Sequence, residues 1–327
     1  MVTLADIRSA QVRLRGIAVH TPLIECKLCD AGPRRLFLKP ENQQPIGAFK
    51  LRGAYNKIAS LSAEDRKRGV ITYSSGNHAQ GVAYAARALG TRAVIVMPNN
   101  APAIKREATA ALGAEIVLVG PGSAERQIEA ERLALQHGYV IVPPYNDEQI
   151  IAGQGTMGLE ILEDLADVEM VLAPVGGGGM LSGVATAIKL STPTVTLIGV
   201  EPELAGDAQA SFRAGKIVQF PAEDVSRTIA DGLRTQSIGT INFEHIRRYV
   251  DDIITVTEKE IRDAMKYLLT NTGIAVEPSG AVSVAGFIFH AAQLPHAKLA
   301  VAIISGGNVD PKMLEEIRGQ REECGKI

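Results

Sequence analysis

Short apolar runs and longer amphipathic segments alternate along most of the chain. The apolar runs have the length and composition of buried strands, and turns rich in glycine, serine and asparagine separate them from segments with helical spacing. The predicted strands are residues 36–39, 70–73, 93–97, 116–119, 139–142, 170–173, 194–200 and 299–304. The predicted helices cover residues 3–15, 50–60, 77–89, 123–136 and 184–190, and a further one ends near residue 112. This rhythm predicts an α/β fold in which helices cover both faces of mainly parallel sheets.

Four consecutive glycines, Gly176, Gly177, Gly178 and Gly179, lie between a predicted strand and a predicted helix. Residues without a β-carbon let consecutive backbone N–H groups point at one ligand, and the start of the following helix adds a favourable dipole. The run therefore indicates a phosphate-binding turn. It is neither a P-loop, because no Lys-Ser or Lys-Thr follows it, nor the G-x-G-x-x-G turn of dinucleotide-binding folds. A tight turn that serves only close packing is the alternative.

Polar loops follow four of the predicted strands, at the edge where parallel sheets bind their ligands. They begin after Tyr73, Val175, Val200 and Ile304. Lys50 begins a further helix, behind a loop that contains glycine and proline. A phosphate site together with a lysine amine suggests pyridoxal phosphate, whose aldehyde forms a Schiff base with a lysine. From the residues alone this cofactor is one option among several, because a lysine at the start of a helix is usually only solvated.

The composition argues against nucleic-acid and membrane partners. The 327 residues are 46% hydrophobic and 4% aromatic, and 34 basic residues nearly balance 36 acidic ones. Neither a basic stripe nor an aromatic platform for nucleic acid is visible. The apolar stretch 281–289 is about half as long as a bilayer span, and the polar N-terminus does not resemble a signal sequence. We expect a cytoplasmic protein, in which Cys26, Cys29 and Cys324 lack the spacing of a zinc site.

Six short motifs occur in the order in which one enzyme family has them. They are AFKLRGA (48–54), SSGNHAQ (74–80), AGQGT (152–156), GGGG (176–179), IADG (229–232) and SGGN (305–308). On these motifs the chain resembles the threonine/serine dehydratase and serine racemase family of fold-type II pyridoxal phosphate enzymes. The resemblance implies a tryptophan synthase β-like fold with two parallel-type sheets. It also implies a large cofactor-binding domain, residues 1–68 and 148–327, and a small mobile domain, residues 69–147.

The resemblance further implies roles for individual residues. Lys50 forms the Schiff base with the cofactor, and Phe49 packs beside the pyridine ring. Asn77 binds the ring hydroxyl, and Ser305 faces the pyridine nitrogen. The phosphate is bound by Gly176, Gly177, Gly178, Gly179 and Met180. The substrate carboxylate is bound by Ser74, Ser75, Gly76, Asn77 and His78.

These roles favour a β-elimination. Lys50 acts as the general base that removes the Cα proton. A hydroxyl such as Ser305 cannot protonate the pyridine nitrogen as a carboxylic acid would, which favours prompt loss of a β-leaving group. Loss of a β-hydroxyl from an amino acid such as threonine or serine then gives a 2-oxo acid and ammonia.

Ser75 leaves a second activity open. Dehydratases of the family often have alanine at this position, whereas the chain is similar to the racemases in having serine on the cofactor face opposite the lysine. A second acid–base group on that face would allow reprotonation of Cα from the other side. The alternative role for Ser75 is to cap the following helix or to bind the substrate carboxylate. A dehydratase is thus the leading interpretation and a racemase with elimination as a side reaction the second. A cofactor-binding protein without turnover, or a dinucleotide oxidoreductase on a similar fold, is the third.

A divalent cation is the second cofactor that the resemblance implies. Glu201, Ala205 and Asp207 match the spacing of a site in the racemase-like members, where two carboxylates and one backbone carbonyl share the ion with waters. Oxygen ligands of this kind suit Mg²⁺ or Ca²⁺. Two carboxylates at this spacing are common on any loop, so the expectation depends on the resemblance. His78 is expected to donate or accept a hydrogen bond in the pocket wall rather than to bind metal.

Two departures from the family pattern concern substrate and regulation. Many relatives have Thr-Gly-Ser where this chain has IGA (46–48), so two hydroxyls are missing beside Lys50. This pattern looks more like dehydratases of substituted β-hydroxy amino acids, such as phenylserine or hydroxyectoine-derived compounds. Hydroxyaspartate is another substituted substrate of the class that we expect. About 20 residues follow Gly307, too few for the C-terminal regulatory domain of the biosynthetic threonine dehydratases. The family also suggests a homodimer.

Overall fold

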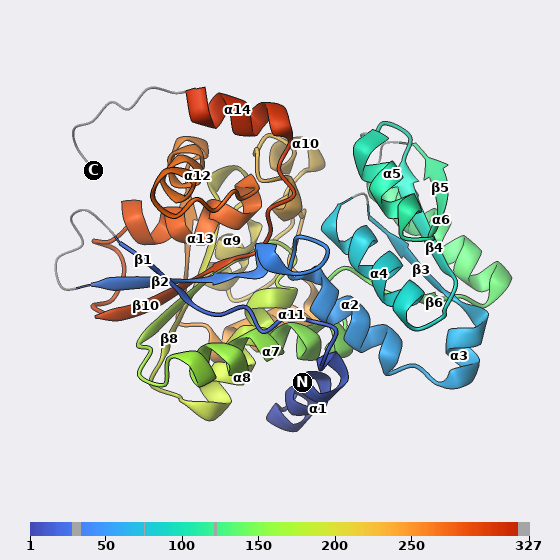
Figure 1. The fold of residues 1–327 in the computed structure, drawn as a ribbon, viewed down its shortest axis with the longest axis horizontal. Coiled ribbons are helices and arrows are strands. Elements are labelled where there is room, and N and C mark those ends of the chain that lie inside the picture. The colour runs from blue at the N-terminus through green and yellow to red at the C-terminus, as the bar shows by residue number, and fades with distance from the viewer. Residues whose placement is uncertain (28–33, 75, 102, 121–122, 320–327) are drawn as a thin grey trace.

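The computed structural model describes residues 1–27, 34–74, 76–101, 103–120 and 123–319 (Figure 1). Its strands form two sheets. The larger sheet has the strand order β1-β2-β10-β7-β8-β9, and the smaller sheet has the order β5-β4-β3-β6. All neighbouring strands are parallel except β1 and β2. The α/β class with mainly parallel sheets, predicted from the rhythm of the sequence, is therefore confirmed.

The larger sheet lies between two layers of helices. Its strands are β1 (Ile24–Cys26), β2 (Arg35–Pro40), β7 (Met170–Pro174), β8 (Thr196–Pro202), β9 (Asp252–Val256) and β10 (Leu299–Ile304). Met170 and Leu172 of β7 pack toward α12 (Glu258–Thr272) and α13 (Pro278–Phe289). Val171 and Ala173 pack toward the opposite layer, which consists of α7 (Glu148–Asp164), α8 (Gly179–Ser191) and α11 (Thr240–Tyr249). This alternation along a strand produces two separate hydrophobic cores.

The smaller sheet has the same construction. Its strands are β3 (Val70–Tyr73), β4 (Ala93–Pro98), β5 (Glu115–Val119) and β6 (Val140–Ile141). The helices around it are α4 (Asn77–Ala88), α5 (Ala103–Ala111) and α6 (Ser123–His137). Helix α2 (Lys50–Ala59) packs against both α4 and α7, so it joins the small sheet to the large one (Figure 1). The remaining elements are α1 (Leu4–Leu14), η1 (Glu41–Gln43), α3 (Ala63–Arg68), η2 (Glu203–Ala205), α9 (Asp207–Ala214), α10 (Ala222–Val225), η3 (Asp231–Leu233) and α14 (Pro311–Gly319).

A buried cluster of charged side chains surrounds Arg52 of α2. The guanidinium of Arg52, which is 1% exposed, donates two hydrogen bonds to Glu41 and two to Glu160, at 2.6–2.8 Å. Lys39 donates to the same Glu160 at 2.6 Å and to the carbonyl of Thr21 at 2.6 Å. Buried charges are tolerated when each is paired and hydrogen-bonded, as these are. The cluster therefore fixes β2, η1, α2 and α7 relative to one another.

Helix α13 contains the apolar stretch 281–289 that the sequence suggested was too short for a bilayer span. It is apolar on all sides because it is buried between the larger sheet and α12. No helix in the described ranges has both the length and the apolar character needed to cross a membrane.

Candidate active site

Lys50 is the first residue of α2, at the carboxyl edge of the larger sheet. The backbone N–H of Phe49 donates to the carbonyl of Ser305 at 3.1 Å, which attaches the lysine loop to the end of β10. The amine of Lys50 donates to the carbonyl of Pro144 at 2.7 Å and lies 5.2 Å from the centre of the Phe49 ring. Burial of the amine lowers the pKa of Lys50 to about 8. An amine that loses its proton near pH 8 can act as a nucleophile and as a general base.

The glycine run forms the turn between β7 and α8. Gly178 has a φ of 91°, in the left-handed region, and is the N-cap of α8 without a side chain that could accept the first helix amides. The structure starts α8 at Gly179, five residues earlier than the predicted start at residue 184. The first amides of a helix have no acceptor within the helix. At this turn they are available to an anion such as a phosphate.

Two adjacent residues connect the lysine to this turn. Pro144 accepts the hydrogen bond from Lys50, and the ring of Tyr145 packs on Gly177 so closely that a β-carbon at position 177 would overlap it. Tyr145 could not be identified from the sequence, since a tyrosine in a loop carries no signal of its own. The dipeptide Pro144-Tyr145 thus contacts the Lys50 amine through its first residue and the glycine turn through its second.

The residues around the turn fit the phosphate end of pyridoxal phosphate. Besides the uncapped start of α8, the hydroxyl oxygen of Thr235 is buried and has no hydrogen-bond partner among the described residues. It lies 3.5 Å from the position that a β-carbon on Gly176 would take. An unpartnered buried hydroxyl is costly unless a ligand or water satisfies it. The site therefore has hydrogen-bond donors for an anion and, at Lys50, an amine for an aldehyde.

The start of α4 is a second uncapped helix start. Its N-cap is Gly76, whose N–H donates to the hydroxyl of Ser74 at 3.3 Å, and no side chain among the described residues is seen to cap the helix. The Nε2 atom of His78 lies 3.0 Å from the carbonyl oxygen of Val142, to which it donates. Burial, with a smaller effect of Lys50, lowers the pKa of His78 to about 3, so the imidazole is neutral. A helix start with free amides suits a carboxylate. Ser75 lies outside the described residues, as do Cys29 and Cys324.

Ser305 and Asn77 are held by residues of the α13 start. The hydroxyl of Ser305 donates to the carbonyl of Ser279 at 3.2 Å. The Asn77 amide donates to the carboxylate of Glu277 at 2.7 Å. Burial, and then the charge of Asp231, raise the pKa of Glu277 to about 7. Glu277 is a site residue that the sequence did not reveal, because a glutamate before proline at the start of a helix carries no functional signal of its own.

Glu201 and Asp207 come together at the end of β8. The carboxylate of Glu201 accepts the backbone N–H groups of Ala208 at 3.2 Å and Gln209 at 2.6 Å, so it caps α9. Both carboxylate oxygens of Asp207 are buried and accept no well-aligned hydrogen bond among the described residues, although the backbone N–H groups of Asp207 and Ile238 lie near enough to oppose the rise of its pKa. Burial raises the pKa of Asp207 to about 7, and burial together with Asp207 raises the pKa of Glu201. Ala205 is buried in η2, yet no group of three His, Cys, Asp or Glu side chains in the described ranges is placed to hold a metal.

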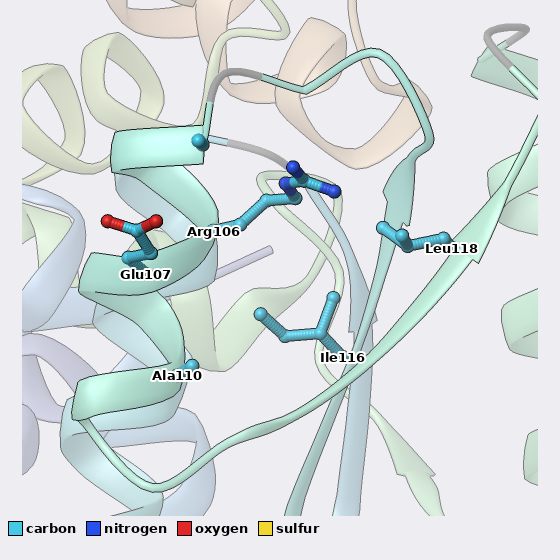
Figure 2. Close-up of a pocket in the computed structure, with 6 residues that line it drawn as sticks. Arg106, Glu107, Ala110, Ile116 and Leu118 are labelled. Carbon is cyan, nitrogen blue, oxygen red and sulfur yellow. The ribbon is translucent and has the colours of Figure 1, made fainter.

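A shallow pocket lies between α5 and β5, away from the residues described above (Figure 2). Its volume is about 300 Å³, and its lining consists of Ala103, Arg106, Glu107, Ala110, Ile116 and Leu118. Arg106 extends from α5 toward β5, and the carboxylate of Glu107 points in the opposite direction from the same helix (Figure 2). None of the predicted site residues lines this pocket.

Known proteins resemble the chain over nearly its whole length. The family model of pyridoxal-phosphate dependent enzymes matches residues 15–306. The chain is 45% identical to the L-threonine ammonia-lyase of Thermotoga maritima, over 97% of this chain and 78% of that protein. It is 40% identical to the L-threo-3-hydroxyaspartate ammonia-lyase of Saccharomyces cerevisiae, over 98% of each. The structure of maize serine racemase superposes with a TM-score of 0.92 at 38% identity, over 96% of both chains.

Proposed function

The chain belongs to the family of pyridoxal-phosphate dependent enzymes, and from this membership we propose how its site treats a substrate. The resemblance found in the motifs is confirmed. The protein is a dehydratase that eliminates water from a β-hydroxy amino acid and yields a 2-oxo acid and ammonia, as its ammonia-lyase relatives at 40% and 45% identity indicate. The observation that carries the proposal is the desolvated amine of Lys50, held by Pro144 beside the residue that packs on the glycine turn.

Pyridoxal phosphate fits the residues present, and we assign its contacts as follows. Lys50 holds it covalently, Phe49 packs beside its ring, Asn77 binds its ring hydroxyl and Ser305 faces its ring nitrogen. Its phosphate is bound at the turn formed by Gly176, Gly177, Gly178, Gly179 and Met180. When bound, the cofactor supplies the electron sink that makes the Cα proton of an amino acid acidic.

The chain's own groups supply the remaining chemistry. The Nζ atom of Lys50 takes the proton from Cα, which it can do because its pKa of about 8 leaves much of the amine neutral near that pH. The free amides at the start of α4, with Ser74, Ser75, Gly76, Asn77 and His78, bind the substrate carboxylate. The hydroxyl of Ser305 already donates to Ser279, and it is no acid that could protonate a ring nitrogen. These features favour elimination.

We also propose a cation site, a closure of the small domain and a dimeric assembly. Glu201, Asp207 and the carbonyl of Ala205 bind Mg²⁺ or Ca²⁺, supported by the two buried oxygens of Asp207 that accept no well-aligned hydrogen bond among the described residues. Residues 69–147 act as a small domain that closes on the large domain, residues 1–68 and 148–327, and excludes water from the site. The enzyme is cytoplasmic and forms a homodimer. Light scattering on the purified protein tests the oligomeric state.

Racemisation is the second candidate function, because the structure of maize serine racemase matches with a TM-score of 0.92. In this alternative Ser75 reprotonates Cα from the face opposite Lys50.

One assay separates the two functions. We would measure 2-oxo acid release from L-threonine, L-serine, threo-3-hydroxyaspartate and L-threo-phenylserine, with chiral analysis of the remaining amino acid. Formation of oxo acid without accumulation of the D-enantiomer supports the dehydratase and identifies its substrate class. A D-enantiomer that forms faster than oxo acid supports the racemase. Absence of both products, in a protein that shows the cofactor's visible absorption, contradicts both candidates. Lys50→Ala is the control and should lose all turnover.

A further inference from the structure

We propose that Glu277 and Asn308 are positioning residues that fix the orientation of the Asn77 side-chain amide, so that Asn77 offers an N–H to the cofactor and not its oxygen. This inference rests on the proposed function, since it concerns how the cofactor is held. Glu277 and Asn308 act through Asn77.

The orientation follows from a short series of hydrogen bonds that begins at a backbone carbonyl. The Nδ2 atom of Asn308 donates to the carbonyl of Ile46 at 2.9 Å. A carbonyl oxygen only accepts, so the NH₂ group of Asn308 must face it. The same Nδ2 donates its other hydrogen to Oδ1 of Asn77 at 2.7 Å. The oxygen of Asn77 is therefore directed toward Asn308, and its NH₂ group points the other way.

Glu277 fixes the amide of Asn77 from the opposite side. Its Oε1 atom accepts a hydrogen bond from Nδ2 of Asn77 at 2.7 Å. Glu277 is 5% exposed, its backbone N–H donates to the carbonyl of Gly306 at 3.2 Å, and a β-carbon at Gly306 would overlap its carboxylate. An ionised carboxylate only accepts, and a protonated one still has a carbonyl oxygen that accepts. The acceptor role of Glu277 is thus independent of its protonation.

One hydrogen of the Asn77 amide remains once these bonds are counted. The Oδ1 atom is bonded to Asn308, and one N–H is bonded to Glu277. A primary amide has two N–H groups, so the second N–H, for which the described residues supply no acceptor, is the group left for a ligand. It matches an oxygen that accepts, which for the cofactor is the ionised form of the ring hydroxyl. These hydrogen bonds also join four segments, namely the loop before Lys50, the loop after β10, the start of α4 and the start of α13. The residues are Ile46, Asn308, Asn77 and Glu277.

The test uses the holoenzyme and two readouts that do not depend on turnover. These are the dissociation constant of pyridoxal phosphate, from fluorescence titration, and the visible absorption band of the bound cofactor. Glu277→Ala and Asn308→Ala should each weaken binding by about tenfold, the usual effect of one lost buried hydrogen bond, and should shift the band in the same direction. Glu277→Gln should bind as the wild type does, because its side-chain oxygen still accepts. Glu260→Ala, which changes a glutamate in the first turn of α12, is the matched control and should leave the dissociation constant and the absorption band unchanged.

A double-mutant cycle with Asn77→Ala tests the route of the effect. If Glu277 acts through Asn77, then Glu277→Ala has no further effect once Asn77 is alanine. Additive effects overturn the inference, as does a Glu277→Gln variant that is as defective as Glu277→Ala, since charge and not orientation would then matter. Asn308→Asp, which keeps the shape but cannot donate, should match or exceed Asn308→Ala and covers the case in which an alanine variant fails to fold. A wild-type protein without a bound-cofactor band contradicts the proposed function itself, whereas a normal band that none of the variants alters contradicts only this inference.

Discussion

Burial sets the chemistry of Lys50, the residue on which the proposed reaction depends. Its pKa of about 8 lies below the ordinary value of 10.5, because the amine is removed from water. The neutral form is the nucleophile and the base. The amine therefore becomes reactive at a lower pH than a solvated lysine.

The first prediction concerns the pH dependence of cofactor attachment. The rate at which the apoprotein reacts with pyridoxal phosphate should rise through a midpoint near pH 8 and then level off, because the neutral fraction of Lys50 is then complete. Stopped-flow absorbance from about pH 6.5 to pH 10.5 measures this, and Lys50→Ala should lack the phase. A rate that still climbs at pH 10 would contradict the lowered pKa.

The second prediction concerns the proposed cation at Asp207. Added Mg²⁺ or Ca²⁺ should raise the unfolding temperature of the wild type, because an ion that binds only the native state stabilises it, by about 2.7 kcal/mol at a concentration 100 times Kd. Asp207→Asn should abolish the shift. Glu203→Gln, at an exposed carboxylate on η2, should keep it. An equal rise in unfolding temperature in both variants would show that the cation does not bind at Asp207.

The site residues differ in how far the sequence could reveal them. Lys50, Asn77 and Ser305 stand in motifs, and the structure brings the segments that hold them together. Glu277 and Tyr145 could not be found in this way, because their contacts depend on the fold: the Glu277 to Asn77 bond joins residues 200 positions apart. A glutamate at the start of a helix and a tyrosine in a loop look the same in sequence whether or not they lie in a site.

At the scale of elements, the turn between β7 and α8 shows how local preference and tertiary packing compete. Glycine is a poor helix former, so the predicted helix began at residue 184, after the run. In the structure α8 begins at Gly179, and its early turns pack against α7. Packing of small residues outweighs the cost of glycine in the first turn.

The third prediction tests this turn. Gly177→Ala should weaken binding of pyridoxal phosphate at least tenfold, because its β-carbon would overlap Tyr145 and displace the amides that bind the phosphate. Binding of pyridoxal, which has no phosphate, should change little. Gly319→Ala is the control, since a β-carbon there meets no atom within 4 Å. Equal losses for both ligands would argue against a phosphate site at the run.

At the scale of the whole molecule, the rhythm of strands and helices predicted two mainly parallel sheets but not their strand order. Strand β10, the last strand among the described residues, pairs with β2 on one side and β7 on the other. Hydrophobic patterns identify a buried strand without naming its neighbours, because any apolar strand can fill a central position. The buried cluster around Arg52 was likewise invisible, since its partners Glu41 and Glu160 are 11 and 108 positions away.

The fourth prediction concerns that cluster. Arg52→Met should lower the free energy of unfolding by about 3–5 kcal/mol, because it leaves the buried carboxylate of Glu41 without a cation and leaves Glu160 paired with Lys39 alone. Arg132→Met, which removes a surface pair with Glu129, should cost less than about 1 kcal/mol. Denaturant unfolding of both variants measures the difference. A similar cost for both would mean that the buried cluster contributes no more than a surface pair.

The central position of β10 has a consequence for the protein during its synthesis. The small sheet uses residues 70–141 only, so its strands can pair while translation continues. The lysine loop, in contrast, is attached to Ser305 and Asn308, which leave the ribosome long after the loop itself. A nascent chain therefore holds its lysine and its small sheet, and later its glycine turn, before it is able to align them. Cofactor capture in the native geometry has to wait until the last strand is in place.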